Sequence, residues 1–248
     1  MMISKNYFII LGLLLYSSST CNQITPEDKI QLSNDIKWVR RSFEYRALCI
    51  QTYNSAWNYA KKTTTGLSEN WAVLLDVDET VLDNSFYEEY IFKMGEKYPY
   101  FWDDWVKRAE AELISGAKSF IDSVRSLTPF ANIVFITNRD TSQETATIEN
   151  LKRHQLWSQE DRILCRRDRA DTKEKRRKEV SEGTGRCNSD GKRIIIALIG
   201  DQMNDVTELD REKSLEVQKS EVLDNEKWGQ GWFILPNPMY GYWLNDYK

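Results

Sequence analysis

Histidine and cysteine are scarce in this sequence, and their scarcity excludes several kinds of site. The 248 residues contain one histidine, His154, so neither a zinc site with several imidazole ligands nor a pair of catalytic histidines can be assembled. The four cysteines include no C-x-x-C pair. They allow too few bridges for a disulfide-stapled scaffold, and the fold must depend on its hydrophobic core.

An excess of positive charge is also missing. The chain has 34 basic and 38 acidic residues, with a formal net charge of −4 and a pI near 5.3. A general nucleic-acid-binding domain is usually strongly basic, so we expect no nucleic-acid polymer as a partner. The 41% of hydrophobic residues supply a sizeable core, and the length suits one large or two modest domains.

The first 20 residues have the pattern of a secretory signal peptide. Lys5 precedes an apolar run over 7–16, which is too short for a membrane span of about 20 residues. Small polar residues follow, and then Cys21. This order resembles a bacterial lipoprotein signal, which implies cleavage before Cys21, a lipid anchor on it and attachment to the outer membrane. The alternative is an ordinary export signal, with a secreted or periplasmic product and an incidental cysteine.

Apolar patterning in the rest of the chain predicts an α/β fold. Residues 21–70 show helical spacing, with Ile36, Val39 and Phe43 on one face. Compact apolar runs at 72–75, 133–136, 194–199 and 232–235 predict strands covered on both faces, and 162–165 is a weaker fifth strand. Amphipathic stretches at 117–127, 141–155 and 172–180 predict helices between them. Strand and helix in alternation indicate a doubly wound parallel sheet over 71–248.

One insertion interrupts this alternation, at about 83–115. It contains no strand-like run but many aromatic residues, including Phe86, Trp102 and Trp105. We expect a small helical cap. Its aromatic side chains form either a packed core or a wall of the substrate site.

Polar residues follow three of the predicted strands at their carboxyl ends. They are Asp76 and Asp78, Thr137 and Asn138, and Asp201 with Asp205 four residues later. The carboxyl ends of the strands in an open α/β sheet meet at one crevice, so these side chains should face one another. Carboxylates crowded in this way need a neutralising cation, and an all-oxygen ligand set suits Mg²⁺. The arrangement is typical of phosphoryl transfer.

Several longer motifs resemble those of a known family. They are DVDETVLDNS at 76–85, W-x-x-W-V at 102–106, SGA at 115–117, TNR at 137–139 and LPNPMYG at 235–241. The first motif, with the later threonine, lysine and G-D-x-x-x-D, resembles the haloacid dehalogenase superfamily with its Rossmann-like core. Together the motifs resemble the class C acid phosphatases, bacterial outer-membrane lipoproteins that hydrolyse phosphomonoesters, including nucleoside 5′-monophosphates. The resemblance extends from about residue 24 to the C-terminus.

The resemblance implies a role for each matching residue. Asp76 would be the nucleophile that forms an aspartyl-phosphate, and Asp78 would be the general acid and base. Thr137 and the backbone N–H of Asn138 would hold phosphate oxygens. Mg²⁺ would be held by Asp76, the backbone carbonyl of Asp78 and Asp201, with Asp205 beside it or contacting it.

The resemblance also implies a lysine that neutralises the nucleophile and the phosphate. The segment 166–178 contains eight basic and three acidic residues. Its charge pattern indicates a solvated, charge-laced helix rather than a nucleic-acid patch in an acidic exported protein. Lys173 fits the expected position best, and Lys175 is the alternative.

The substrate is less sharply indicated. Phe86 and Tyr240 match positions where relatives stack a nucleobase, although both could be ordinary packing residues. We expect a Mg²⁺-dependent acid phosphatase acting on small phosphomonoesters such as nucleoside 5′-monophosphates. Sugar or aromatic phosphates are alternative substrates. A non-catalytic binding or storage lipoprotein on the same fold is a further alternative, and the presence of both Asp76 and Asp78 argues against it.

Overall fold

Five apolar segments form one parallel sheet in a computed structural model that describes residues 31–209 and 212–244. The strand order is β5-β4-β1-β6-β7, and every neighbouring pair is parallel. The strands are β1 (Trp71–Leu75), β4 (Ala131–Asp140), β5 (Arg162–Arg166), β6 (Ile194–Gly200) and β7 (Trp232–Ile234). All five predicted strands are present, including the weaker one at 162–165.

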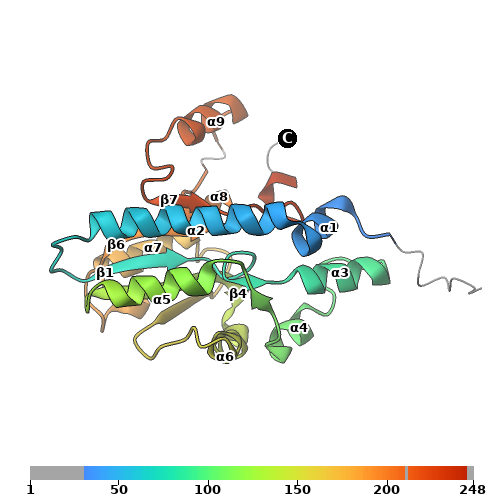
Figure 1. Ribbon diagram of the computed structural model, residues 1–248, viewed down its shortest axis with the longest axis horizontal. Coiled ribbons are helices and arrows are strands. Elements are labelled where there is room, and N and C mark those ends of the chain that lie inside the picture. The colour runs from blue at the N-terminus through green and yellow to red at the C-terminus, as the bar shows by residue number, and fades with distance from the viewer. Residues whose placement is uncertain (1–30, 210–211, 245–248) are drawn as a thin grey trace, which may run out of the picture. The chain divides into compact units, whose positions relative to one another are not determined.

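Helices cover both faces of this sheet (Figure 1). Alternate residues of β1 point to opposite faces. Trp71, Val73 and Leu75 join the larger apolar cluster with α2 (Phe43–Thr63) and α5 (Ala117–Leu127). Leu74 joins a second cluster that includes Val180 of α7 (Lys173–Glu182). The predicted doubly wound α/β fold is therefore confirmed.

The chain order also places a switch point at β1. The connection from β1 leads through α5 to β4, then through α6 (Glu144–Arg153) to β5 on one side of the sheet. The chain then crosses to β6 and β7 on the other side. A crevice for ligands is expected beyond the carboxyl end of the strand where this reversal occurs.

The predicted helix over 141–155 is shorter than expected. A 3₁₀ turn, Thr141–Gln143, precedes α6. Strand β4 continues to Asp140, whose side chain accepts a hydrogen bond from the backbone N–H of Ser142, and whose backbone N–H donates to Gln143 Oε1. This capping box fixes the strand-to-helix turn.

Two helices form the described part of the N-terminal segment. In α1 (Asn34–Arg41), Arg40 forms a salt bridge with Glu89 of α3 (Ser85–Met94). The hydroxyl of Ser42 caps α2 by accepting from the Tyr45 N–H at 3.0 Å, and α2 contacts α5, β6 and β7. The division into residues 21–70 and 71–248 stays a prediction, and the signal segment with Cys21 lies outside the described residues.

The insertion after β1 folds as helices and a small ribbon. It contains α3 and α4 (Trp102–Arg108), and β2 (Leu82–Asp83) pairs antiparallel with β3 (Glu112–Leu113). The expectation of no strand in this segment was wrong, because two-residue strands are too short to show a periodic pattern. Tyr87 and Trp105 are buried, so packing accounts for part of its aromatic content.

The described part of the chain contains three cysteines, Cys49, Cys165 and Cys187, and all three are buried free thiols. Across the residues described, none of the helices is long and apolar enough to span a bilayer.

Candidate active site

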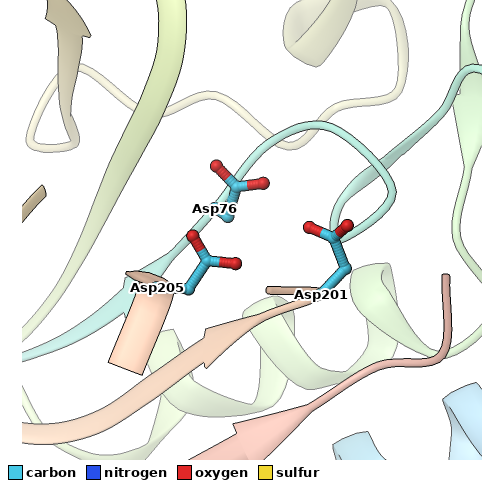
Figure 2. Close-up of side chains that lie close together, drawn as sticks. All are labelled: Asp76, Asp201 and Asp205. Atoms are coloured by element: carbon cyan, nitrogen blue, oxygen red, sulfur yellow. The ribbon is translucent and has the colours of Figure 1, made fainter. Parts of the chain in front are cut away.

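Three aspartates meet at the carboxyl ends of β1 and β6 (Figure 2). Asp76 follows β1, Asp201 follows β6, and Asp205 lies in the short helix α8 (Met203–Val206). Each offers a carboxylate oxygen, and these oxygens all lie within 4.8 Å of one another. The sheet thus brings together side chains that are more than 120 positions apart in the sequence, as the strand ends predict.

A tight loop after β1 sets the directions of Asp76 and Asp78. The Asp76 N–H donates to Ile199 O at 2.9 Å, which ties Asp76 to β6. The carbonyl of Val77 accepts from the N–H groups of Val81 and Leu82 at 2.9 and 2.8 Å. These bonds fold the chain back directly after the strand, so that Asp76 and Asp78 both line the same cavity.

Gly200 makes room for the third aspartate. A Cβ atom at this position would lie 2.1 Å from a carboxylate oxygen of Asp205. No larger residue fits without displacing Asp205, which explains the glycine directly before Asp201.

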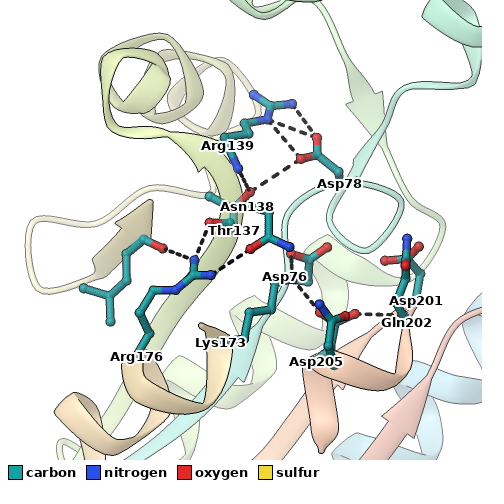
Figure 3. A network of polar contacts seen from close by, with 12 residues as sticks. Asp76, Asp78, Thr137, Asn138, Arg139, Lys173, Arg176, Asp201, Gln202 and Asp205 are labelled. Atoms are coloured by element: carbon teal, nitrogen blue, oxygen red, sulfur yellow. Dashed lines mark hydrogen bonds and ion pairs between the residues drawn. The ribbon is translucent and has the colours of Figure 1, made fainter. Parts of the chain in front are cut away.

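Lys173 is the lysine that reaches these carboxylates. Its Nζ donates to Asp76 and, at 2.5 Å, to Oδ1 of Asp205 (Figure 3). Burial alone would lower the pKa of Lys173, but Asp205 and Asp76 outweigh it and raise this pKa. Lys175 is exposed, and its Nζ donates instead to the carbonyl of Ala170, so the alternative lysine does not reach the site.

The carboxylates carry more negative charge than Lys173 balances. Burial raises the pKa of Asp76 to about 7, against the effect of Lys173 and with the help of Asp205 and Asp78. Burial, Asp205 and Asp76 also raise the pKa of Asp201 well above its ordinary value. Within the described residues no ion pair reaches Asp201, which accepts a hydrogen bond from Asn237. Three hard oxygen donors with this uncompensated charge fit a divalent cation such as Mg²⁺.

Asp78 is held by an arginine that directly follows the Thr137–Asn138 pair. Arg139 Nη2 and Nε donate to Oδ1 of Asp78 at 2.8 and 3.0 Å, and Asn84 Nδ2 donates to the same oxygen at 2.8 Å. Thr137 Oγ1 lies 3.5 Å from Oδ2 of Asp78. Neither Arg139 nor Asn84 was predicted as a site residue.

Helix α7 supplies two further basic side chains. Arg176 is fully buried and donates to the carbonyls of Thr137 and Leu164 and, at 2.7 Å, to Oδ1 of Asn138. Arg177 donates to the carbonyl of Asp205 at 3.0 Å. The expectation of a solvated helix therefore holds for only part of α7. The spacing of Lys173, Arg176 and Arg177 at i, i+3 and i+4 is the signal that indicates a shared face.

A cavity of about 930 Å³ opens onto the aspartates. Its wall includes Asn138 and Lys173, and the aromatic residues Tyr98, Trp102 and Tyr240. Phe86 is not part of this wall: it is 53% exposed and its ring stacks on Trp105 at 5.7 Å. His154 lies away from the cavity wall, with Nε2 2.8 Å from the carbonyl of Ala111.

A parallel sheet with acidic residues after β1 and β6 and a threonine in β4 agrees with the resemblance to the haloacid dehalogenase superfamily. The model of one family, the HAD superfamily, subfamily IIIB (Acid phosphatase), matches residues 18–243 of this chain, which therefore belongs to that family. The chain is thus a hydrolase of the acid phosphatase class, and small phosphomonoesters are its class of substrate.

Solved structures agree with this assignment. The chain is similar to the class C acid phosphatase from Bacillus anthracis, with 36% sequence identity and a TM-score of 0.72. The match covers 86% of this chain and 88% of that protein. A second structure of the Bacillus anthracis enzyme, with tungstate bound, matches over the same shares at 35% identity, also with a TM-score of 0.72.

Proposed function

We propose that this acid phosphatase is a Mg²⁺-dependent phosphomonoesterase that works through an aspartyl-phosphate on Asp76. The observation that carries the proposal is the position of Asp76 and Asp78 in one cavity, with Lys173 in contact with the first and Thr137 close to the second. The tungstate bound to the Bacillus anthracis relative, an oxyanion like phosphate, supports an anion site of this kind.

In the first step, a carboxylate oxygen of Asp76 attacks the phosphorus of the ester, and the bond from phosphorus to the leaving oxygen breaks. Asp78 donates its proton to that oxygen, so the product leaves as an alcohol. Lys173 and the backbone N–H of Asn138 offset the charge on the non-bridging oxygens, and Thr137 helps to orient the phosphoryl group.

In the second step, Asp78 takes a proton from a water molecule, whose oxygen attacks the aspartyl-phosphate. The bond between phosphorus and Asp76 breaks, which releases inorganic phosphate and restores the Asp76 carboxylate. Asp78 is then protonated again, and the cycle is complete.

Asp76, Asp201 and the backbone carbonyl of Asp78 would hold the metal ion, with Asp205 beside them. When bound, Mg²⁺ neutralises negative charge on the phosphoryl group and on the carboxylates. Asp205 also anchors Lys173, and Asn237 orients Asp201.

The aromatic residues of the cavity wall support nucleoside 5′-monophosphates as substrates in preference to sugar phosphates. Tyr98, Trp102 and Tyr240 line it, and stacking of a base on an aromatic ring contributes about 1–3 kcal/mol with little dependence on the base. Sugar phosphates offer no flat ring for these side chains, whereas aromatic phosphates do. The ring of Phe86 lies against Trp105 and outside the cavity wall. Its contact with a base stays a prediction.

The reaction is tested by phosphate release from a chromogenic aryl phosphate, with and without EDTA, in wild type and Asp76→Asn. We expect EDTA to abolish activity, excess Mg²⁺ to restore it, and the variant to be inactive. Activity that survives both the chelator and the substitution would refute the proposal. No release by a folded wild type supplied with Mg²⁺ would favour a non-catalytic binding protein.

The substrate class is tested separately, with nucleoside 5′-monophosphates and sugar phosphates compared in wild type and Tyr240→Ala. We expect kcat/KM for the nucleotides to fall about tenfold in the variant, since one stacking contact is lost, and kcat/KM for sugar phosphates to stay the same. An equal loss for both classes would contradict base stacking.

We also propose that the protein is exported and anchored by lipid at Cys21, on the pattern of residues 1–21. Mass spectrometry of the mature N-terminus should find an acylated cysteine, and Cys21→Ser should release the protein from the membrane fraction. An unmodified Cys21 in a cleaved, soluble wild type would instead indicate an ordinary export signal.

A further inference from the structure

We propose that Arg139 and Asn84 are positioning residues that hold the Asp78 carboxylate in the orientation in which it acts on the leaving group. This inference rests on the proposed role of Asp78 as the general acid. It concerns two side chains that have no part in the chemistry proposed above.

The two carboxylate oxygens of Asp78 have different surroundings (Figure 3). Oδ1 accepts three hydrogen bonds: from Arg139 Nη2 at 2.8 Å, Arg139 Nε at 3.0 Å and Asn84 Nδ2 at 2.8 Å. Oδ2 has only longer contacts, to Arg139 Nε at 3.3 Å and Thr137 Oγ1 at 3.5 Å. Three donors therefore hold Oδ1 in place, and Oδ2 is the oxygen with fewer and longer hydrogen bonds.

Arg139 is rigid enough to impose this difference. Its side chain is 1% exposed, and its Nη1 donates to Thr147 Oγ1 at 3.0 Å. The Thr147 hydroxyl in turn donates to the carbonyl of Gln143 at 2.9 Å. With both ends of the guanidinium fixed, the planar fork holds the carboxylate of Asp78 in one orientation.

The cap contributes to the same arrangement. The ring of Trp102 lies 5.4 Å from the guanidinium carbon of Arg139, and Trp105 Nε1 donates to Oδ1 of Asn84 at 2.8 Å. Asn84 also donates through its backbone N–H to Glu79 at 2.7 Å. Arg139 and Asn84, which donate to Asp78, are therefore each in contact with a tryptophan of α4.

Loss of this positioning should affect substrates unequally. A nitrophenolate leaving group departs without help from an acid, whereas an alkoxide needs the proton that Asp78 delivers. If Arg139 orients Asp78, its replacement slows the cleavage of alkyl phosphates much more than that of aryl phosphates. A purely structural role, or direct binding of phosphate by Arg139, would slow both equally.

The experiment compares kcat/KM for 4-nitrophenyl phosphate and glycerol 2-phosphate in wild type, Arg139→Gln, Arg139→Lys and Asp78→Asn. We expect the ratio of aryl to alkyl activity to rise about 10- to 100-fold in Arg139→Gln, a share of the 10²–10⁴-fold that general acid catalysis supplies. Arg139→Lys should lie between it and wild type, and it remains available if the glutamine variant does not fold. Inhibition by inorganic phosphate should change less than about threefold, below 1 kcal/mol.

The matched control is Arg153→Gln. Arg153 also joins the core to the cap, by donating to the carbonyls of Arg108 and Ala109 at 3.0 Å, but it does not contact Asp78. Its replacement should leave the ratio unchanged. A ratio that rises equally in this control, or stays constant in both Arg139 variants, would overturn the positioning role.

Asp78→Asn separates this inference from the proposed function. The ratio of aryl to alkyl activity should rise in this variant as well. If it stays constant in Asp78→Asn, the general-acid role itself fails. If it rises there but not in the Arg139 variants, only the positioning role fails.

Discussion

The guanidinium of Arg176 donates a 2.7 Å hydrogen bond to Oδ1 of Asn138 and another to the carbonyl of Thr137. A helix on one face of the sheet thereby fixes Thr137 and Asn138 in β4, where we propose that phosphate binds. The guanidinium also donates to the carbonyl of Leu164 in β5 at 3.1 Å. One buried side chain thus joins three parts of the fold that are distant in sequence.

We expect Arg176→Met to lower the free energy of unfolding by about 2–4 kcal/mol, because two carbonyls and an amide oxygen lose a charged donor. Urea denaturation measures this loss, and the inhibition constant of phosphate should rise in the same variant. Lys178→Met is the control, since Lys178 lies two residues along the same helix and its side chain is exposed. Equal stability of the two variants would contradict a structural role for Arg176.

The aspartate cluster predicts that metal binding stabilises the fold. At a Mg²⁺ concentration 100 times its dissociation constant, the gain is about 2.7 kcal/mol, or roughly 5–10 °C in Tm for a chain of this size. Asp201→Asn should lose this shift in a thermal melt, while Asp122→Asn, at an exposed position paired with Lys118, should keep it. A full shift in Asp201→Asn would place the metal elsewhere.

Lys173 and Lys175 offer a matched pair of substitutions. Lys173→Met leaves buried Asp76 and Asp205 without their cation, and breaking such a pair costs about 3–5 kcal/mol. Lys175→Met removes an exposed side chain and should change the free energy of unfolding by less than about 0.5 kcal/mol. Urea unfolding in EDTA measures both, and activity should be lost only in Lys173→Met. Comparable effects would contradict the placement of Lys173.

Glu88 predicts a pH dependence of stability. Burial, with a smaller contribution from Asp35, raises its pKa from 4.5 to about 7, so the folded protein holds this proton to a higher pH than the unfolded chain. The contribution of Glu88 to stability is therefore complete below about pH 4.5 and is lost as the pH rises through about 7. Because the carboxyl is partly exposed, solvent reduces the effect below what the full pKa shift would give. We expect wild type to lose about 1–2 kcal/mol of its free energy of unfolding between pH 5 and pH 8, and Glu88→Gln to avoid this loss.

Urea unfolding at the two pH values, in EDTA, measures this difference. Glu89 is the control on the same helix, because its salt bridges to Lys93 and Arg40 outweigh burial and lower its pKa. Glu89→Gln should not change the difference between pH 5 and pH 8. The prediction would be contradicted if wild type and Glu88→Gln showed the same difference in stability between pH 5 and pH 8.

Much of the fold could be predicted because buried parallel strands are marked by short, continuous apolar runs. The same runs locate the site, since a parallel sheet brings the residues after its strands to one edge. Asp76 and Asp201 were therefore placed together from sequence alone. The boundaries were less accurate: β4 extends through polar residues to Asp140, because Asp140 still pairs with Arg166 of β5 after a shift in register.

The parts that could not be predicted depend on the direction of individual side chains. The sequence 173–177 presents several basic residues, and only the start of α7 at Lys173 decides which of them face the aspartates. Arg139 stands in a recognisable motif, but its fork on Asp78 depends on the loop after β1. The β2–β3 ribbon is too short to leave a periodic pattern, and the orientation of Phe86 depends on Trp105.

The common origin of Lys173, Arg176 and Arg177 on α7 has a consequence for sequence change. Each residue of an α-helix is rotated by about 100° from the one before it. Removal of one residue between Lys173 and Arg176 would turn Arg176 and Arg177 away from the carbonyls they contact while Lys173 stayed in place. The outer surface of α7 should therefore accept many substitutions, whereas the segment from Lys173 to Arg177 should accept no insertion or deletion, because its length sets the directions of all three basic side chains.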